Sequence, residues 1–578
     1  WLYDDEKPFI HVDALDVFAF LKEKLGTGYY EELIRRYLLE NLHGAVVIVE
    51  PEQGRTARMD AALAEKLQEY KESLGREEQE ELVRRTKELE AYQSAPEREE
   101  DLARIPVLKR EDISREIEPV INEEMNLAGV PLVFHETQTN GIGYVDLMFD
   151  LSGVREDLLP YVGILQSVLG IIDTEHYSYG ELFNEINRCT GGIGTSLELY
   201  NDVTRRRRAA RGDVGGPGAI GVFLLVVLAS IGIFISKLPG FHKLPMVFSM
   251  AGEILTASKL GDEKRLREIL AMAKSRLLMR FQSSGHSTAA LRALSYGSPS
   301  AKLKDLTNGI DFYRTVAALE EKFEEKKEEL IRILQELARQ LFRPDNLMIS
   351  YTASREGLKG LEELIRSLKE GLFTDPVEEE TCVLHCEKKN EGFKTASKVQ
   401  YVARTGNFID QGAEYTGALQ ILKVILSYDY LWQNIRVKGG AYGCMSSFNR
   451  IGEGYLVSYR DPHLKRTMDV YEGVTEYLKN FTVSERDMTK YIIGTMSNID
   501  HPMTPCAKGE RSMNLYMNKV SPEMIREERR QILEAGQEDI RALAKVTEAL
   551  LAAGQICVIG SEEKIEEEKE LFETVTSF

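Results

Sequence analysis

The sequence predicts an α+β protein that contains a duplicated α/β unit, and three observations lead to this prediction. Segments with the 3.6-residue apolar spacing of helices alternate with short β-branched runs typical of strands. A helix end, two glycines and a strand follow one another twice, in "EINRCTGGIGTSLELY" and in "NIRVKGGAYGCMSSF". Placing Gly191-Gly192 over Gly439-Gly440 also places Arg188 over Arg436. We therefore expect an internal repeat of roughly 200 residues or more, although helix–Gly-Gly–strand is also a common way to end a helix.

The first 115 residues are expected to hold the end of one domain and a connector. Residues 1–50 combine helical spacing with the β-branched run Ala45–Val49, so we predict a strand there and the end of a preceding α/β domain. Residues 51–115 consist mainly of charged residues and strong helix formers, with one break near Gly75. This pattern predicts a helical hairpin with solvated faces, followed by an acidic linker.

Residues 116–355 are predicted to form the first copy of the repeated unit. "GVPLVFHETQTNGIGYVDLMFDLSG" has two apolar runs around Asn140-Gly141, which predicts a β-hairpin. Helical patterns dominate from about Leu244 to Gln340, and "DNLMISYTA" predicts a strand. Residues 356–393 are expected to connect this unit to its second copy, residues 394–578, which has the same order of strands, long helix, Gly-Gly and strand.

Residues 205–240 do not fit the pattern of this unit. Val214–Ser236 carries no charge and follows a run of arginines, as a marginal membrane-spanning helix with a positive inner end would. Two other interpretations are a buried pair of strands and an error in the reading frame. A spanning helix would place two halves of one soluble unit on opposite sides of a membrane, so we predict that the segment does not span.

Composition limits the possible functions. The 578 residues carry a net charge of −20, which argues against a general nucleic-acid surface because phosphate binding needs clustered Lys and Arg. The six cysteines are too scattered for a disulfide framework. The opening "WLYDDEKPF" is acidic where a signal peptide would be basic. We expect a reducing location, the cytoplasm or an organelle matrix.

No motif in the sequence supplies a catalytic or metal site. Cys382, His385 and Cys386 lie close together in "TCVLHCEKK", but zinc usually needs three or four ligands and a second cluster is missing, so an ordinary strand is the better interpretation. "IDTEH" ends like a His-x-x-Glu-His zinc motif but has Ile172 in place of the first histidine, which predicts that Glu175 and His176 are surface residues.

The candidate binding residues are Arg436, Tyr442 and Arg460, with Gly439 and Gly440 between the first two. Arginine offers a planar fork of donors that suits a carboxylate or a peptide carbonyl, and tyrosine offers one hydroxyl. The glycines let another backbone approach closely. Such a group can hold a peptide but cannot hydrolyse it alone. The alternative is a helix-capping arginine and a packed tyrosine.

Several long motifs together resemble one family. "NIRVKGGAYG", "SYRDP", "IPVLKREDISREIEP", "YSYGELFNEINRCTGGIG" and "YLLENLHGAVVIVEP" are similar to the presequence-protease and falcilysin branch of the pitrilysin–insulinase zinc peptidases. The resemblance covers nearly the whole chain apart from roughly residues 205 to 240. It implies four related α/β domains with antiparallel-rich sheets and packed helices, arranged as a clamshell of two halves that a helical hairpin joins.

The resemblance also implies a function. In that family a first domain holds zinc through His-x-x-Glu-His and a later Glu, and the last domain presents an Arg and a Tyr, here Arg436 and Tyr442, with Arg460 as the second Arg. The zinc-binding domain is not in this sequence, so we expect neither zinc nor peptidase activity from this chain alone. The expected partners are unfolded peptides and a catalytic N-terminal half, in the same chain or a separate one.

Two classes of function remain open at this point. The chain is either the substrate-binding half of a zinc endopeptidase that degrades unfolded peptides in a closed chamber, or a non-catalytic binding or scaffold protein of the same fold. Retention of the Arg–Gly-Gly–Tyr arrangement favours the first class, because a scaffold does not need it.

Overall fold

The structure is a computed structural model that describes residues 4–12, 14–50, 52, 54–95, 98–102, 104–106, 108–204, 226–234, 243–377, 382 and 384–578. The chain forms two compact units, Trp1–Pro106 and Val107–Phe578.

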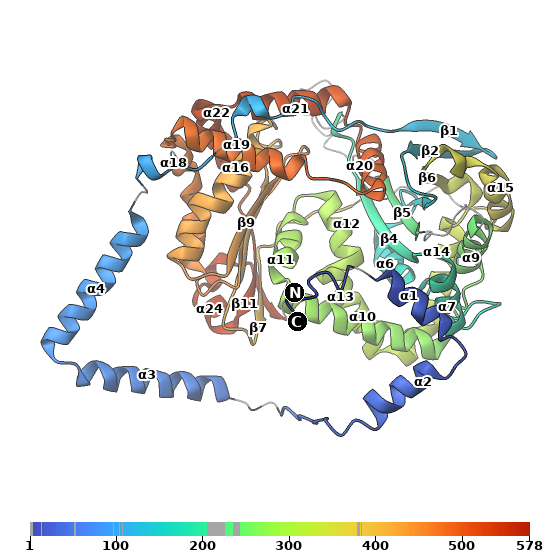
Figure 1. Ribbon diagram of the computed structural model, residues 1–578, viewed down its shortest axis with the longest axis horizontal. Coiled ribbons are helices and arrows are strands. Elements are labelled where there is room, and N and C mark those ends of the chain that lie inside the picture. Colours follow the sequence, from blue (N-terminus) through green and yellow to red (C-terminus); the bar gives the residue numbers. More distant parts are fainter. Residues whose placement is uncertain are drawn as a thin grey trace. The chain divides into compact units, whose positions relative to one another are not determined.

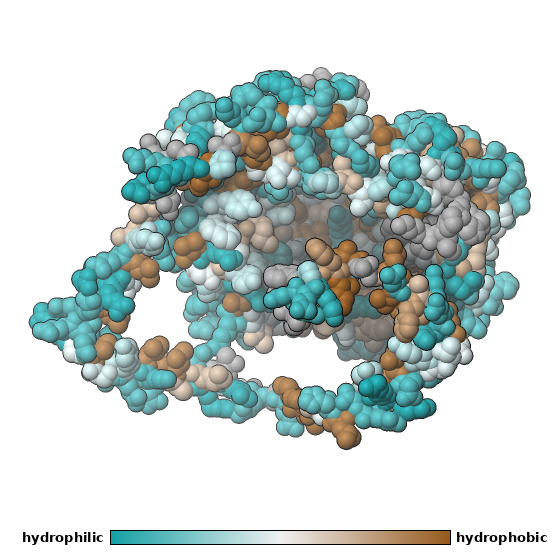
Figure 2. Space-filling view, viewed as in Figure 1, coloured by the Kyte–Doolittle hydropathy of each residue, from teal (hydrophilic) through white to brown (hydrophobic). Residues whose placement is uncertain are grey.

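The first unit is helical. Its helices are α1 (Leu15–Glu23), α2 (Tyr29–Ile34) with a π-helical continuation (Arg35–Leu39), α3 (Arg55–Ser73), α4 (Arg76–Ser94) and α5 (Glu99–Leu102). The two helices predicted for residues 51–115 therefore form as α3 and α4, and the chain breaks between them at Gly75, whose N–H donates to Glu78. Every side chain described in these two helices is exposed, and apolar groups stand out at intervals along them in Figure 2.

The strand predicted for Ala45–Val49 is wrong for this structure. The whole stretch 41–50 lies in neither helix nor strand. The four side chains from Val46 to Val49 are between 80% and 91% exposed. A strand needs a neighbouring strand to pair its backbone groups, and none is described within this unit.

The second unit contains two six-stranded sheets among its described residues (Figure 1). The first has the order β1-β2-β6-β3-β5-β4 and the second the order β12-β7-β11-β8-β10-β9. Their strands are β1 (Glu123–Leu127), β2 (Val130–Glu136), β3 (Tyr144–Asp150), β4 (Gly192–Tyr200), β5 (Val226–Phe234), β6 (Leu347–Ala353), β7 (Glu391–Thr395), β8 (Tyr401–Asn407), β9 (Gly443–Phe448), β10 (Glu453–Tyr459), β11 (Gln555–Ser561) and β12 (Thr574–Ser577).

Strand order and direction confirm the predicted duplication. In the first sheet, β6 lies between β2 and β3, parallel to β2 and antiparallel to β3. In the second sheet, β11 lies between β7 and β8 in the same way, parallel to β7 and antiparallel to β8. The remaining two strands follow in antiparallel pairs, β3-β5-β4 and β8-β10-β9. Only the strand beyond β2 or β7 differs, since β1 runs antiparallel and β12 parallel to its neighbour.

The hairpin predicted around Asn140-Gly141 is half right. Both residues have positive φ, 53° and 79°, as a tight turn requires. The strands that they connect, β2 and β3, do not pair with each other, because β6 lies between them. The actual hairpin is β1–β2, whose turn residues Ala128 and Gly129 have φ of 51° and 78°.

The second unit also contains the helices of both copies. In the first copy they are α6 (Leu159–Val168), α7 (Tyr179–Cys189), α9 (Leu244–Thr256), α10 (Glu263–Ser283), α11 (Gly285–Leu294), α12 (Pro299–Asn308), α13 (Ile310–Glu321), α14 (Phe323–Leu341) and α15 (Leu361–Gly371). In the second they are α16 (Ala418–Ile425), α17 (Lys465–Glu472), α18 (Val474–Lys479), α19 (Glu485–Ile499), α20 (Pro505–Met517), α21 (Pro522–Glu534), α22 (Gln537–Ala542), α23 (Ala544–Ala552) and α24 (Glu562–Glu567).

The second sheet is buried on both faces. Alternate strand residues enter two different cores, because successive side chains of a strand point to opposite sides. Tyr401, Ala403 and Cys557 pack into the core that the first copy builds, whereas Val402 and Val558 pack with α16 and α23. Helix α11 of the first copy covers the former face, where it contacts β8, β10 and β11. The core of the first copy therefore extends onto one face of the second sheet.

The anomalous segment 205–240 lies mostly outside the described residues. Its described part, β5, is a strand between β3 and β4. Among the residues that the structure places, no helix has both the length and the apolar character needed to cross a bilayer.

Candidate functional site

Arg436 lies in the last turn of a long helix that ends at the two glycines. Helix α16 continues as two π-helical turns, Leu426–Tyr430 and Trp432–Val437. The N–H of Gly440 donates to the Arg436 carbonyl and the N–H of Ala441 to the Ile435 carbonyl, at 2.8 and 3.1 Å, as in a left-handed helix cap. Gly440 has φ of 77°. A glycine at position 440 therefore suits the left-handed backbone that ends this helix.

Gly439 allows a close backbone approach, but within its own chain. A Cβ at this position would lie 2.3 Å from the Ile435 carbonyl oxygen. The tight end of the helix therefore requires a glycine at this position, and the approach of a second backbone stays a prediction. Gly440 differs, since the atom nearest to a Cβ built there is 3.8 Å away, in Pro462.

Tyr442 stands at the start of β9 with its ring in solvent. Its N–H donates to the Tyr459 carbonyl at 3.0 Å, and the two rings meet edge to face with centroids 5.6 Å apart. The side chain is 63% exposed, so it is not the packed tyrosine of the alternative interpretation. Its hydroxyl bonds to no residue in the described part of the chain.

Arg436 is held between two aromatic rings. Its guanidinium lies 4.3 Å from the Trp432 ring centroid and 5.4 Å from that of Tyr442, and Nη1 donates to the Tyr442 carbonyl. Cation–π attraction to both rings holds the guanidinium in place. Nε and Nη2 have no bonding partner among the residues described, so two donors remain for a ligand.

Arg460 completes the group from the end of β10. Its φ is 49°, a left-handed conformation that a non-glycine residue adopts only when its surroundings impose it. The guanidinium lies 5.5 Å from the Tyr459 ring centroid. The strained backbone places Arg460 in the same cleft as Arg436 and Tyr442.

The cleft has a volume of about 420 Å³ and is lined by Trp432, Arg436, Val437, Gly440, Ala441, Tyr442 and Arg460. It thus brings together four of the five predicted site residues, and Gly439 lies behind its wall. The lining contains two cations and a phenol and no carboxylate. This set of donors can bind an anion or a polarised carbonyl oxygen. It contains neither a base nor a nucleophile.

The residues described do not fit a zinc site. Within the described ranges no three His, Cys, Asp or Glu residues lie close enough to hold an ion. His385 pairs instead with Glu156 at 2.7 Å, and the segment 384–390 is not the strand that the sequence predicted. His176 is exposed, as predicted, and pairs with Glu253 at 2.9 Å. All six cysteines are free.

Trp432 is the site residue that the sequence analysis missed. Its position four residues before Arg436 on one helix was a usable signal, because such pairs lie on the same helix face. The duplication offers a comparison: Arg188 occupies the equivalent helix end in the first copy, but its Nε and Nη2 both donate to Glu185, at 3.1 and 2.6 Å. Of the two, only Arg436 of the second copy keeps these donors available.

Comparisons with known proteins identify the family and the fold. A family of domains associated with subgroup C of the M16 peptidases matches residues 49–212 and 234–319, and a "PreP C-terminal domain" family matches residues 390–562. The gap between the first two ranges falls inside the anomalous segment. A protease from Helicobacter pylori has a similar fold, with a TM-score of 0.51 over 76% of this chain and 98% of that chain, at 12% identity.

The chain therefore belongs to the pitrilysin–insulinase, or M16, family of peptidases. Within it, the two matched domains place the chain in the presequence-protease branch, where it corresponds to the C-terminal half. It is 34% identical to the protein HypA from Clostridium perfringens and 25% identical to a chloroplast and mitochondrial presequence protease from Arabidopsis thaliana. These matches cover 100% and 98% of this chain but 57% and 51% of the relatives, so the chain spans about half their length.

Proposed function

We propose that this chain is the substrate-binding half of a zinc metalloendopeptidase that degrades unfolded peptides within a closed chamber. The observation that carries the proposal is the cleft of Arg436, Tyr442 and Arg460, whose lining includes free donors of Arg436 and Tyr442 and no carboxylate. Because the cleft has no base or nucleophile, water activation belongs to a catalytic half that carries His-x-x-Glu-His, a motif that this sequence does not contain.

The donors suit the charge that develops when water attacks a peptide bond. The free Nε and Nη2 of Arg436 and the Tyr442 hydroxyl can bind a substrate carbonyl and then the oxyanion that replaces it. The two aromatic contacts hold the guanidinium in place beforehand, so little reorganisation is needed during reaction. Removing one donor of this kind typically costs about 2.7–4 kcal/mol, or a factor of roughly a hundred to a thousand in kcat.

Exposed apolar groups in the first unit support the need for a catalytic half. The run Val46–Val49 and the α1 side chains Leu15, Val17 and Phe18 are at least half exposed. Surfaces of this kind mark interaction sites in soluble proteins. The β-branched run Val46–Val49 has the character of a strand without a partner, which a sheet edge in the catalytic half would supply.

The experiment combines this chain with a catalytic half from a relative and measures hydrolysis of an unstructured peptide. Arg436→Lys, which keeps the charge but loses the fork, and Tyr442→Phe should each lower kcat/KM by about a hundredfold or more. The matched controls are Arg188→Lys, the equivalent helix end of the first copy, and Tyr428→Phe, a tyrosine that is 69% exposed on the same helix as Arg436. Both controls should stay within about twofold.

The second part of the experiment uses this chain without a catalytic half. The chain should contain no stoichiometric zinc on metal analysis and cleave no peptide, because a catalytic zinc needs about three protein ligands. If Arg436→Lys and Tyr442→Phe behave like the controls, the pair is structural and the proposal is wrong. Peptide binding without any catalysis in the combined protein would favour the scaffold alternative.

A further inference from the structure

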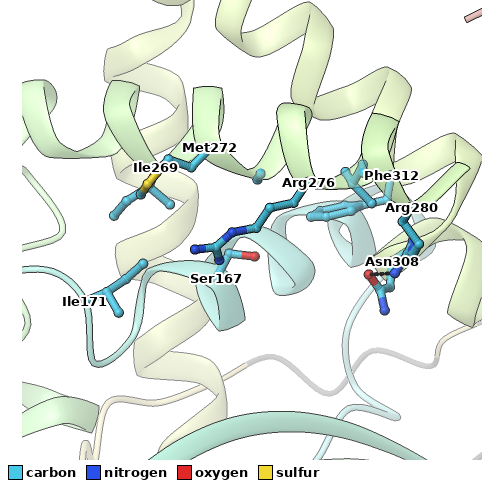
Figure 3. Close-up of a pocket in the computed structure, with 10 residues that line it drawn as sticks. Ser167, Ile171, Ile269, Met272, Arg276, Arg280, Asn308 and Phe312 are labelled. Carbon is cyan, nitrogen blue, oxygen red and sulfur yellow. Dashed lines mark hydrogen bonds between the residues drawn. The ribbon is translucent and has the colours of Figure 1, made fainter. Parts of the chain in front are cut away.

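A second cavity lies in the first copy, between α6, α10 and the junction of α12 with α13. Its volume is about 270 Å³. Figure 3 shows Ile171, Ile269 and Met272 at one end and Phe312 with Arg280 and Asn308 at the other. Neither this group nor its surroundings takes part in the cleft of Arg436.

The cavity combines an apolar interior with two arginines. Ile269, Leu277 and Phe312 are buried in its wall. Arg276 extends from α10 toward Ser167 of α6 in Figure 3, while the Ser167 hydroxyl is occupied by the Gly163 carbonyl at 2.8 Å. No acidic residue lines the cavity.

Neither arginine forms an ion pair with an acidic residue in the described ranges. Arg276 makes no hydrogen bond or ion pair with any residue in the described ranges. Arg280 donates only to Asn308, through its side-chain oxygen at 2.8 Å and its carbonyl. The Arg276 side chain is exposed to solvent, and Asp305 favours the charged form of the half-buried Arg280. A bound anion would replace the solvent at Arg276.

The size of the cavity limits the anion. At about 30 Å³ for each water-sized group, it holds roughly nine non-hydrogen atoms. This corresponds to one leucine-sized residue. The fork of an arginine suits a carboxylate with two parallel hydrogen bonds, and the apolar wall suits a hydrocarbon side chain.

We propose that this cavity binds a free carboxylate carried by a single apolar residue-sized group, with Arg276 as its main anion contact. Two sources have this chemistry: the C-terminal residue of a peptide and a free short-chain carboxylic acid. The peptide source rests on the proposed function, where it would anchor the end of a substrate away from the Arg436 cleft. The free acid does not depend on that function.

Binding to the full chain tests the proposal without any catalytic half. The probes are a fluorescent peptide ending in leucine with a free carboxylate, the same peptide with a C-terminal amide, and 4-methylpentanoate in calorimetry. The free-acid peptide should bind at least about tenfold more tightly than the amide, because a charge-assisted hydrogen bond is lost in the amide. Binding of both the acid peptide and 4-methylpentanoate assigns the site to the carboxylate group in general, and binding of the peptide alone assigns it to peptide ends.

Arg276→Gln should remove this preference for the acid. The matched control is Arg267→Gln, on the same helix, whose side chain is 59% exposed and pairs with Glu324; it should leave affinity unchanged. Equal affinity for acid and amide, or no effect of Arg276→Gln, would overturn the proposal, as would failure of all three probes to bind at millimolar concentration. None of these results bears on Arg436 or Tyr442, so the proposed function would stand or fall separately.

Discussion

Arg292→Met tests the buried ion cluster that joins the two copies of the repeat. Arg292, on α11, is 2% exposed and contacts three carboxylates, those of Asp305, Asp311 and Glu391. Glu391 begins β7 of the second copy, and its carboxylate also accepts from Tyr296 at 3.1 Å. Methionine fills a similar volume without charge, so the substitution removes the cation and leaves the acids in place.

The expected cost follows from burial. Asp305 and Glu391 are 1% and 3% exposed, and breaking a buried pair by removing one partner costs about 3–5 kcal/mol because the remaining charge is uncompensated. Burial already raises the pKa of Asp305, while Arg292 opposes the rise. Without Arg292 this pKa rises further above its value in the unfolded chain. The variant should therefore regain part of its stability at low pH and lose it as the pH rises.

Urea denaturation followed by circular dichroism measures the effect. The control is Arg314→Met, because Arg314 contacts the same Asp311 and Glu391 from the surface, where its side chain is 45% exposed. Exposed pairs contribute about 0–1 kcal/mol. Arg292→Met should lower the urea midpoint several times more than Arg314→Met does. Equal midpoints for the two variants, or a greater loss for Arg292→Met at pH 5 than at pH 8, would refute the reasoning.

Two further predictions concern stability. Burial lowers the pKa of His135 from 6.5 to about 4. The neutral ring therefore stabilises the fold above pH 6.5, and this contribution is lost as the pH falls toward 4. In urea titrations, the difference in unfolding free energy between wild type and His135→Gln should shrink by about 3 kcal/mol from pH 7 to pH 4, and a constant difference would contradict the assignment. Gly285→Ala should destabilise by about 1–3 kcal/mol, because its Cβ would lie 2.2 Å from the Tyr401 ring. Gly494→Ala, whose nearest neighbour would be 3.5 Å away, should instead stabilise α19 by about 0.4–1 kcal/mol. A melting temperature of Gly285→Ala at or above that of the wild type would show that the α11 contact is not tight.

Local sequence patterns predicted the helices, strands and turns of this fold better than they predicted which strands pair with each other. The long helix up to Arg436, the Gly-Gly end and the strand after it all form as expected, since caps and periodicity are properties of neighbouring residues. At Asn140-Gly141 the turn was predicted correctly but the hairpin was wrong. β6, the strand that separates β2 from β3, lies far along the chain and leaves no local signal. Ala45–Val49 failed for the related reason that a β-branched run forms a strand only beside another strand.

In the candidate site, too, the features set by neighbouring residues were predictable and those set by distant residues were not. Arg436 and Tyr442 could be paired from sequence because a six-residue turn joins them, and Trp432 could have been added by its spacing. The left-handed backbone of Arg460 could not be foreseen, since that conformation depends on the pairing of β10 with β9. The cavity around Arg276 could not be predicted either, because one of its walls is α6, which ends at Val168, far before α10 begins at Glu263.

The parallel pairing of β2 with β6 has a consequence for synthesis on the ribosome. β2 ends at Glu136 and its central partner β6 begins at Leu347, so about 210 residues must be made before the first sheet can close. At about 5–20 residues per second this takes roughly 10–40 seconds. During that time the strand edges and the apolar faces of α6 and α9 are open to aggregation, and contacts this distant in sequence also form slowly. The second copy repeats the delay, since β7 waits for β11. A nascent chain of this protein therefore exposes unpaired strand edges twice, once for each half of its own duplication.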